Sequence, residues 1–130
     1  MIDVNIKTIP HQDQRYDTAG DYIIGAISGD GHTRAIELIY VSEIGNHDYE
    51  FLVAVHELIE WYLTERRGIK ETDIMAFDVD HPDLDDPGND PAAPYHREHM
   101  FATEIEKMLC AEMGLDWNVY YKAFDGLEYK

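Results

Sequence analysis

The first third of the chain alternates apolar and polar residues in the manner of β-strands. Residues 2–9 carry apolar side chains at nearly every second position, which is typical of a half-buried strand. Residues 21–28 predict a second strand and residues 34–43 a third. The turn between them, at residues 28–33, contains two glycines and favours a hairpin. We therefore expect a small antiparallel sheet of about three strands.

The pattern then changes to that of a helix with end signals on both sides. Asn46 or Asp48 can cap its start, because their side chains accept hydrogen bonds from free backbone N–H groups. The helix is predicted from about Tyr49 to Arg67, and Gly68 is a natural residue for its C-terminal end. This segment should form the first of two long helices.

A second long helix is predicted from about residue 95 to residue 113. Between the two helices, Thr72 is a candidate cap for a short turn or helix, and residues 78–94 form an acidic loop. Pro94 suits the first turn of the second helix. Gly114 should end it, and Asp116 can cap a last short helix over residues 117–124.

Strands followed by helices indicate an α+β fold. At 130 residues the chain should form a single domain, 1–130. We expect the N-terminal sheet to pack against the two long helices, with the short helix at the C-terminus. Cys110 falls in mid-helix and is expected in the core.

Composition narrows the range of partners and compartments. Lys and Arg number 10 against 27 Asp and Glu, a net charge of -17, which disfavours nucleic acid and suits divalent cations or a basic protein. The N-terminus lacks the pattern of a signal peptide, and no apolar run is long enough to cross a bilayer. One cysteine fits a reducing compartment, so we expect a cytoplasmic protein without a membrane segment.

The stretch VAVHELIEWYL (residues 53–63) carries three ionisable residues in an apolar helix. At 100° per residue, Glu60 falls near 40° from His56 and Glu57 near 100°, so all three share one sector. Imidazole and carboxylate are good ligands for zinc, and Glu57 stands where a metalloprotease keeps its general base. A buried ion pair of His56 with Glu60 is the alternative.

Two protein ligands are too few for zinc, so the second long helix should supply a third. Its apolar stripe includes Phe101 and Met108. His99 on the flank of the stripe is the preferred ligand, and Glu98 within it is a neighbour of the site or the ligand itself. Asp78 is a candidate fourth ligand. Two other acidic features are expected to be solvated: Glu106 beside Lys107, and most of the loop aspartates, which lack EF-hand spacing.

H-E-L-I-E (residues 56–60), the acidic loop and APYHREHMFATEIEKML (residues 93–109) resemble a group of small uncharacterised proteins of bacteriophages and prophages. The similarity runs from IKTIPHQDQRY to GLDW and implies a life in bacterial cytoplasm. A weaker resemblance, to zincin-like metallopeptidases, rests on His56, Glu57 and the order of strand, helix and second helix. It implies hydrolysis of peptide or amide bonds with Glu57 as the base. Glu60 departs from that family's histidine.

Three functions are compatible with these residues. The first is a zincin-like metal-dependent hydrolase of a peptide or protein, in which His56, Glu60 and His99 hold zinc; a mixed histidine and carboxylate set also accepts iron or manganese. The second is an acidic phage protein that inhibits a basic, DNA-binding host protein by charge mimicry. The third is a degenerate zincin whose ion is purely structural.

Overall fold

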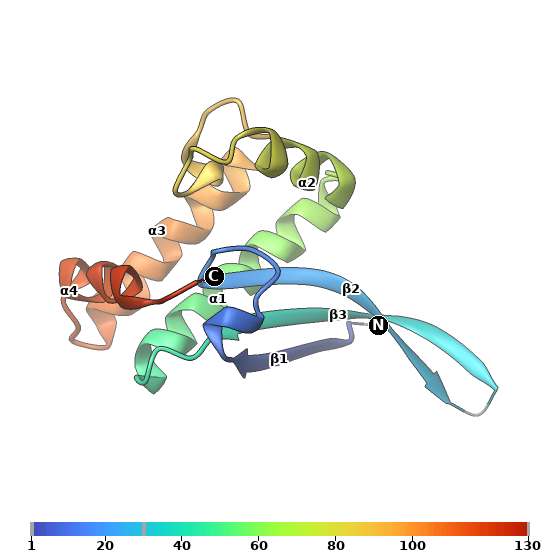
Figure 1. Cartoon of the computed structure of the whole chain (residues 1–130), viewed down its shortest axis with the longest axis horizontal. Coiled ribbons are helices and arrows are strands. Elements are labelled where there is room, and N and C mark those ends of the chain that lie inside the picture. Colours follow the sequence, from blue (N-terminus) through green and yellow to red (C-terminus); the bar gives the residue numbers. More distant parts are fainter. Residues whose placement is uncertain (1, 30, 130) are drawn as a thin grey trace.

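The computed structural model describes residues 2–29 and 31–129, which form a small open sheet and four α-helices (Figure 1). The strands are β1 (Val4–Ile9), β2 (Gly20–Gly29) and β3 (His32–Ser42). Their order is β1-β3-β2. The predicted hairpin is confirmed, since β2 and β3 are antiparallel, although Asp30 of its turn lies outside the described residues. The prediction of a fully antiparallel sheet is wrong, because β1 pairs with β3 in parallel.

The parallel pairing follows from the loop between β1 and β2. Residues 10–19 form a connection long enough to pass over one strand position of the sheet. Strand β2 therefore lies two positions from β1, and β3 occupies the position between β1 and β2. His11 fixes this crossing through two hydrogen bonds, one between Nδ1 and Ser42 Oγ at 2.7 Å and one between Nε2 and Asp17 Oδ1 at 2.8 Å. Ser42 is 0% exposed, so its hydroxyl is closed off from solvent and this serine–histidine–aspartate chain holds the loop.

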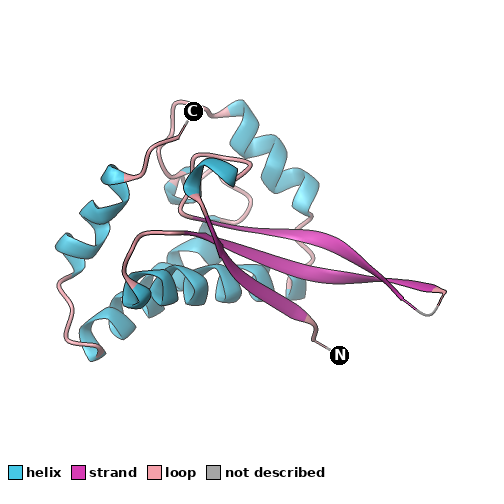
Figure 2. Cartoon of the chain, turned by 60° about the horizontal axis from the view of Figure 1, so that its bottom comes forward, coloured by secondary structure: helices cyan, strands magenta, loops and turns pink. Residues whose placement is uncertain are grey.

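The two long helices are α1 (His47–Arg66) and α3 (His96–Glu112). Helix α1 contacts the sheet with one side and α3 with another, so it occupies the centre of the molecule (Figures 1 and 2). Helices α2 (Glu71–Asp80) and α4 (Trp117–Lys122) lie near opposite ends of α3 (Figure 1). Short 3-10 turns cover His11–Asp13, Pro87–Asn89 and Ala123–Gly126.

Most predicted helix ends are confirmed. The Asn46 side chain accepts from the N–H of Tyr49, and Asp116 caps α4 in the same way. Gly68 and Gly114 have φ of 70° and 72° after the two long helices, in the left-handed region that favours glycine.

Two details of the predicted helix starts are wrong. Thr72 is not a cap, because α2 begins directly after Lys70 and Thr72 lies inside the helix. The turn before it is short, since the Ile69 N–H already bonds to Thr64 O at the end of α1. Pro94 precedes α3 rather than lying in its first turn, since Tyr95 is the residue before the helix.

The core lies where α1 meets the sheet and the C-terminal helices. Leu52 and Val53 of α1 pack with Ile39 and Val41 of β3, and Cys110 joins them as predicted. Burying each large aliphatic side chain contributes about 1.5–3 kcal/mol, so this cluster fixes α1 against the sheet. Within the described part of the chain, each helix is too short or too polar to cross a membrane.

Candidate metal centre

Helices α1 and α3 bring His56, Glu60 and His99 together in the interior. His56 and Glu60 are one turn apart, and His56 Nε2 lies 2.9 Å from Glu60 Oε2. His99 comes from α3, with Nδ1 2.8 Å from the same Glu60 oxygen and 3.2 Å from His56 Nε2. The three side chains are buried, at 8%, 5% and 7% exposure. Three donor atoms of the types that zinc prefers therefore form one small triangle, which we call the donor triangle.

The size of the donor triangle suits a metal ion. In a tetrahedral site with bonds of about 2.0–2.1 Å, two ligand atoms lie about 3.3 Å apart. The three separations here are 2.8 to 3.2 Å. If the three donor atoms moved apart by a few tenths of an ångström, an ion would fit between them. Small side-chain movements are enough for this.

The outer nitrogen of each histidine is held by a carboxylate. His56 Nδ1 donates to Glu106 Oε1 at 2.8 Å, and the other oxygen of Glu106 accepts a short hydrogen bond from the Tyr120 hydroxyl. His99 Nε2 donates to Asp86 Oδ2 at 3.2 Å. A proton fixed on the outer nitrogen leaves the inner nitrogen, the one in the donor triangle, free to present its lone pair to an ion. Histidine ligands of metals are held in the same way.

Without a cation the same atoms must hold protons. Burial lowers the pKa of His56, but hydrogen bonds to Glu106 and Glu60 outweigh it and raise the pKa to about 11. For His99, burial is likewise outweighed by Asp86 and Glu60, and the pKa rises to about 10. Burial raises the pKa of Glu60, but hydrogen bonds from the two histidines dominate and lower it to about 2. One divalent ion can replace the two inner protons without changing the total charge.

Glu57 lies beside the donor triangle in a cleft of about 850 Å³, which we call the metal cleft. The cleft is lined by all three donor residues and by Glu57, so the donor triangle faces a space large enough for a substrate. Burial, then repulsion from Glu60, raises the pKa of Glu57 well above its usual range. Gly20 of β2 touches Glu57 so closely that a Cβ there would lie 2.6 Å from Glu57 Cγ.

The other predicted ligands have different partners. Glu98 is buried but pairs with Arg67, with Oε2 2.6 Å from the guanidinium. Asp78 lines the metal cleft and accepts from the Tyr95 hydroxyl at 2.8 Å. Neither belongs to the group of residues that could hold one ion.

The prediction that Glu106 is solvated is wrong, whereas the Asp86 side chain stays 38% exposed and also reaches His99. The apolar stripe assumed for the second helix includes Phe101 and Met108, yet these are 51% and 68% exposed. The buried face of α3 is rotated from that stripe toward its polar flank. This rotation brings Glu106 against α1, while the chain before Gly88 carries Asp86 over His99.

Three contributors to the site escaped sequence reasoning. Gly88 packs against the imidazole of His99, where a Cβ would lie 2.5 Å from Cγ. Gly20 and Tyr120 reach the site from β2 and α4, and nothing in their local sequence marks them. Glu106 had one usable signal, because it stands seven residues after His99 and so on the same helix face.

Comparison with protein-family models, with curated proteins and with solved structures finds no match to this chain.

Proposed function

We propose that the protein is a small zincin-like metal-dependent hydrolase that cleaves peptide or amide bonds. The observation that carries the proposal is the donor triangle of His56, Glu60 and His99, with each histidine backed by a carboxylate. Zinc suits this set of donors, and iron or manganese would also accept it. The resemblance of H-E-L-I-E to the active helix of zincins supports the same proposal.

A divalent ion in the donor triangle would supply Lewis acidity and make water nucleophilic near neutral pH. The chain itself supplies the proton transfers. Glu57 would take the proton of the attacking water and later deliver it to the leaving amine, as a general base and then a general acid. A cation beside Glu57 offsets the repulsion from Glu60 and favours the ionised form that a base needs.

The metal cleft favours catalysis over a purely structural ion. A structural zinc site is closed by four protein ligands, whereas a catalytic site keeps one position open. Here three protein donors face a cleft of about 850 Å³. Glu106 and Asp86 are engaged with the outer histidine nitrogens, so neither is free to act as a fourth ligand.

A comparison of wild type with Glu57→Gln tests the proposal. Both proteins are loaded with zinc and incubated with a library of quenched fluorescent peptides. Wild type should cleave a subset of peptides, and the variant should bind zinc equally well but react about 10²–10⁴-fold more slowly. Absence of cleavage by zinc-, iron- and manganese-loaded wild type, or full activity in the variant, would overturn it.

A further inference from the structure

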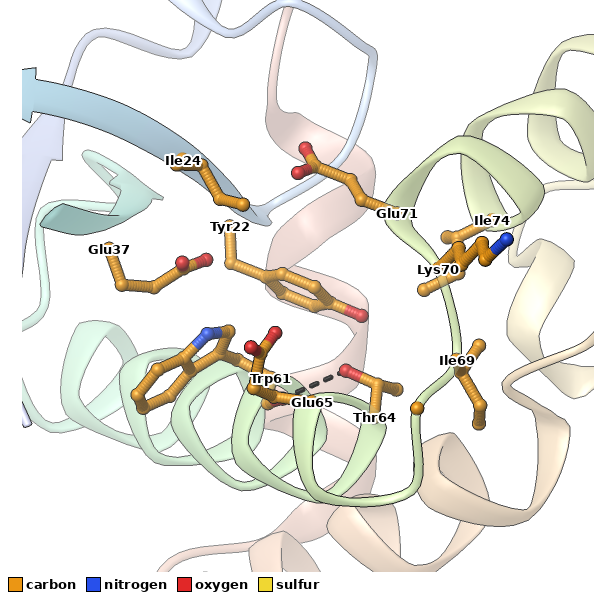
Figure 3. Close-up of a pocket in the computed structure, with 11 residues that line it drawn as sticks. Tyr22, Ile24, Glu37, Trp61, Thr64, Glu65, Ile69, Lys70, Glu71 and Ile74 are labelled. Atoms are coloured by element: carbon orange, nitrogen blue, oxygen red, sulfur yellow. Dashed lines mark hydrogen bonds between the residues drawn. The ribbon is translucent and has the colours of Figure 1, made fainter. Parts of the chain in front are cut away.

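A second, smaller pocket opens beside the metal cleft. Its volume is about 230 Å³, below the roughly 300–1,000 Å³ of sites for drug-sized ligands, so it suits a single side chain. Figure 3 shows strand residues Tyr22 and Glu37 facing Trp61 and Glu65 of α1, with Glu71 of α2 at the rim. We call this space the Glu37 pocket. Tyr22, Glu71 and Ile74 line both it and the metal cleft, so the two spaces adjoin.

Glu37 is out of place for a core-facing strand position. Side chains of β3 alternate, so Glu37 shares a face with the core residues Ile39 and Val41. It is 9% exposed, and among the described residues it forms no ion pair. Burial, followed by repulsion from Glu71 and Glu65, raises its pKa to about 7, while the Trp61 indole lowers it. A buried carboxylate without a cation is costly, which indicates a missing positive partner.

Within the part of the chain that the structure describes, Lys70 and Arg15 do not fill that role. Lys70 lines the pocket, but its side chain extends away from Glu37 and Glu65 (Figure 3). Arg15 stands 3.6 Å from Glu71 at the rim and is held by Asp21 at 2.5 Å. The interior of the pocket is therefore acidic and open to a cation from outside.

A second unpaired polar atom also faces this region. The Tyr22 hydroxyl is buried and makes no hydrogen bond within the described part of the chain, although Thr64 and Glu60 lie beside it. It lies between the two spaces, because Tyr22 lines both of them. Buried hydroxyl groups are nearly always hydrogen-bonded in proteins, so a small movement that pairs this one with Thr64 or with a bound group is expected.

We propose that the Glu37 pocket binds a basic side chain of a peptide, an alkyl stem ending in an ammonium or guanidinium group. Glu37 and Glu65 would neutralise the charge, and the rings of Tyr22 and Trp61 would contact the stem and attract the cation. The net charge of -17 would draw a basic peptide toward this surface. If the proposed hydrolase function holds, the Glu37 pocket is its specificity subsite, because it adjoins the metal cleft.

Binding can be tested without any metal. Protein treated with a chelator is titrated with Nα-acetyl-lysine methylamide, the arginine analogue and the uncharged norleucine analogue. The indole N–H signal of Trp61, assigned with Trp117→Phe, reports binding by NMR. Glu37→Gln is the test variant, and Glu112→Gln, on the exposed end of α3, removes the same charge elsewhere.

Binding of the lysine or arginine probe at least tenfold tighter than the norleucine probe, lost about tenfold in Glu37→Gln and kept in Glu112→Gln, would support the proposal. Equal binding of charged and uncharged probes, or unchanged binding in Glu37→Gln, would overturn it. Specific binding by a protein that cleaves nothing would refute only the hydrolase function. Cleavage of peptides without preference for basic residues, together with no probe binding, would refute only this pocket.

Discussion

Gly88→Ala should displace His99 from the donor triangle without replacing any of the three proposed ligands. The added Cβ would lie 2.5 Å from His99 Cγ and 2.8 Å from Nδ1. Carbon atoms in contact are about 3.5–4.0 Å apart, so the imidazole must move by about 1 Å. Metal–ligand distances tolerate only about 0.2 Å, so one of three bonds should be lost or strained. We expect zinc affinity to fall about 10–100-fold, the usual effect of disturbing the support of a ligand.

Competition with a fluorescent zinc chelator at pH 7.5 measures this affinity. Two alanine variants serve as controls. Gly29→Ala adds a methyl group with nothing within 4 Å and should behave as wild type. Gly20→Ala pushes on Glu57 rather than on a donor residue, so it should keep zinc while losing hydrolytic rate. Wild-type zinc affinity in folded Gly88→Ala would refute the assignment of His99 as a ligand.

Three further predictions concern residues around the two sites. Tyr120→Phe removes the donor to Glu106, so the free energy of unfolding should fall by about 1–3 kcal/mol in urea denaturation; an unchanged value would contradict this contact. Arg67→Met strands the buried Glu98 and should cost about 3 kcal/mol by the same measurement while zinc binding stays intact; loss of zinc would instead place Glu98 in the site. The pKa of Glu37 is raised from 4.5 to about 7, so its contribution to stability is present below pH 4.5 and lost as the pH rises through 7. Glu37→Gln should therefore gain stability relative to wild type by about 1 kcal/mol between pH 4.5 and pH 8, and a flat difference would refute the raised pKa.

The part of the site that depends on one helix could be predicted from the sequence. His56 and Glu60 are neighbours in any helix that spans both, whatever the rest of the fold does. The hairpin and most helix ends could also be predicted, because glycine and asparagine act on the backbone groups next to them in the chain.

Features that depend on how elements meet could not be predicted. The orientation of α3 is set by packing, which leaves Phe101 and Met108 exposed and buries Glu106 instead. A helical wheel centred on the apolar residues of α3 cannot reveal which face is buried, because the buried carboxylates are stabilised by partners on other elements. The parallel pairing of β1 likewise depends on a loop crossing the end of β3.

The charge of the donor triangle links metal binding to pH. The inner nitrogens of His56 and His99 hold protons in the metal-free protein, since their pKa values are about 11 and 10. A metal ion must displace these protons, so its affinity should decline as the pH falls.

Metal content of the purified protein tests the central claim most directly. Protein made in zinc-supplemented medium and purified without chelators should contain about one zinc, iron or manganese ion per chain by elemental analysis. The ion should be lost in His56→Ala and His99→Ala and retained in Arg67→Met, all checked for folding by circular dichroism. Wild-type protein that carries no ion and takes up none on dialysis against zinc would contradict the account.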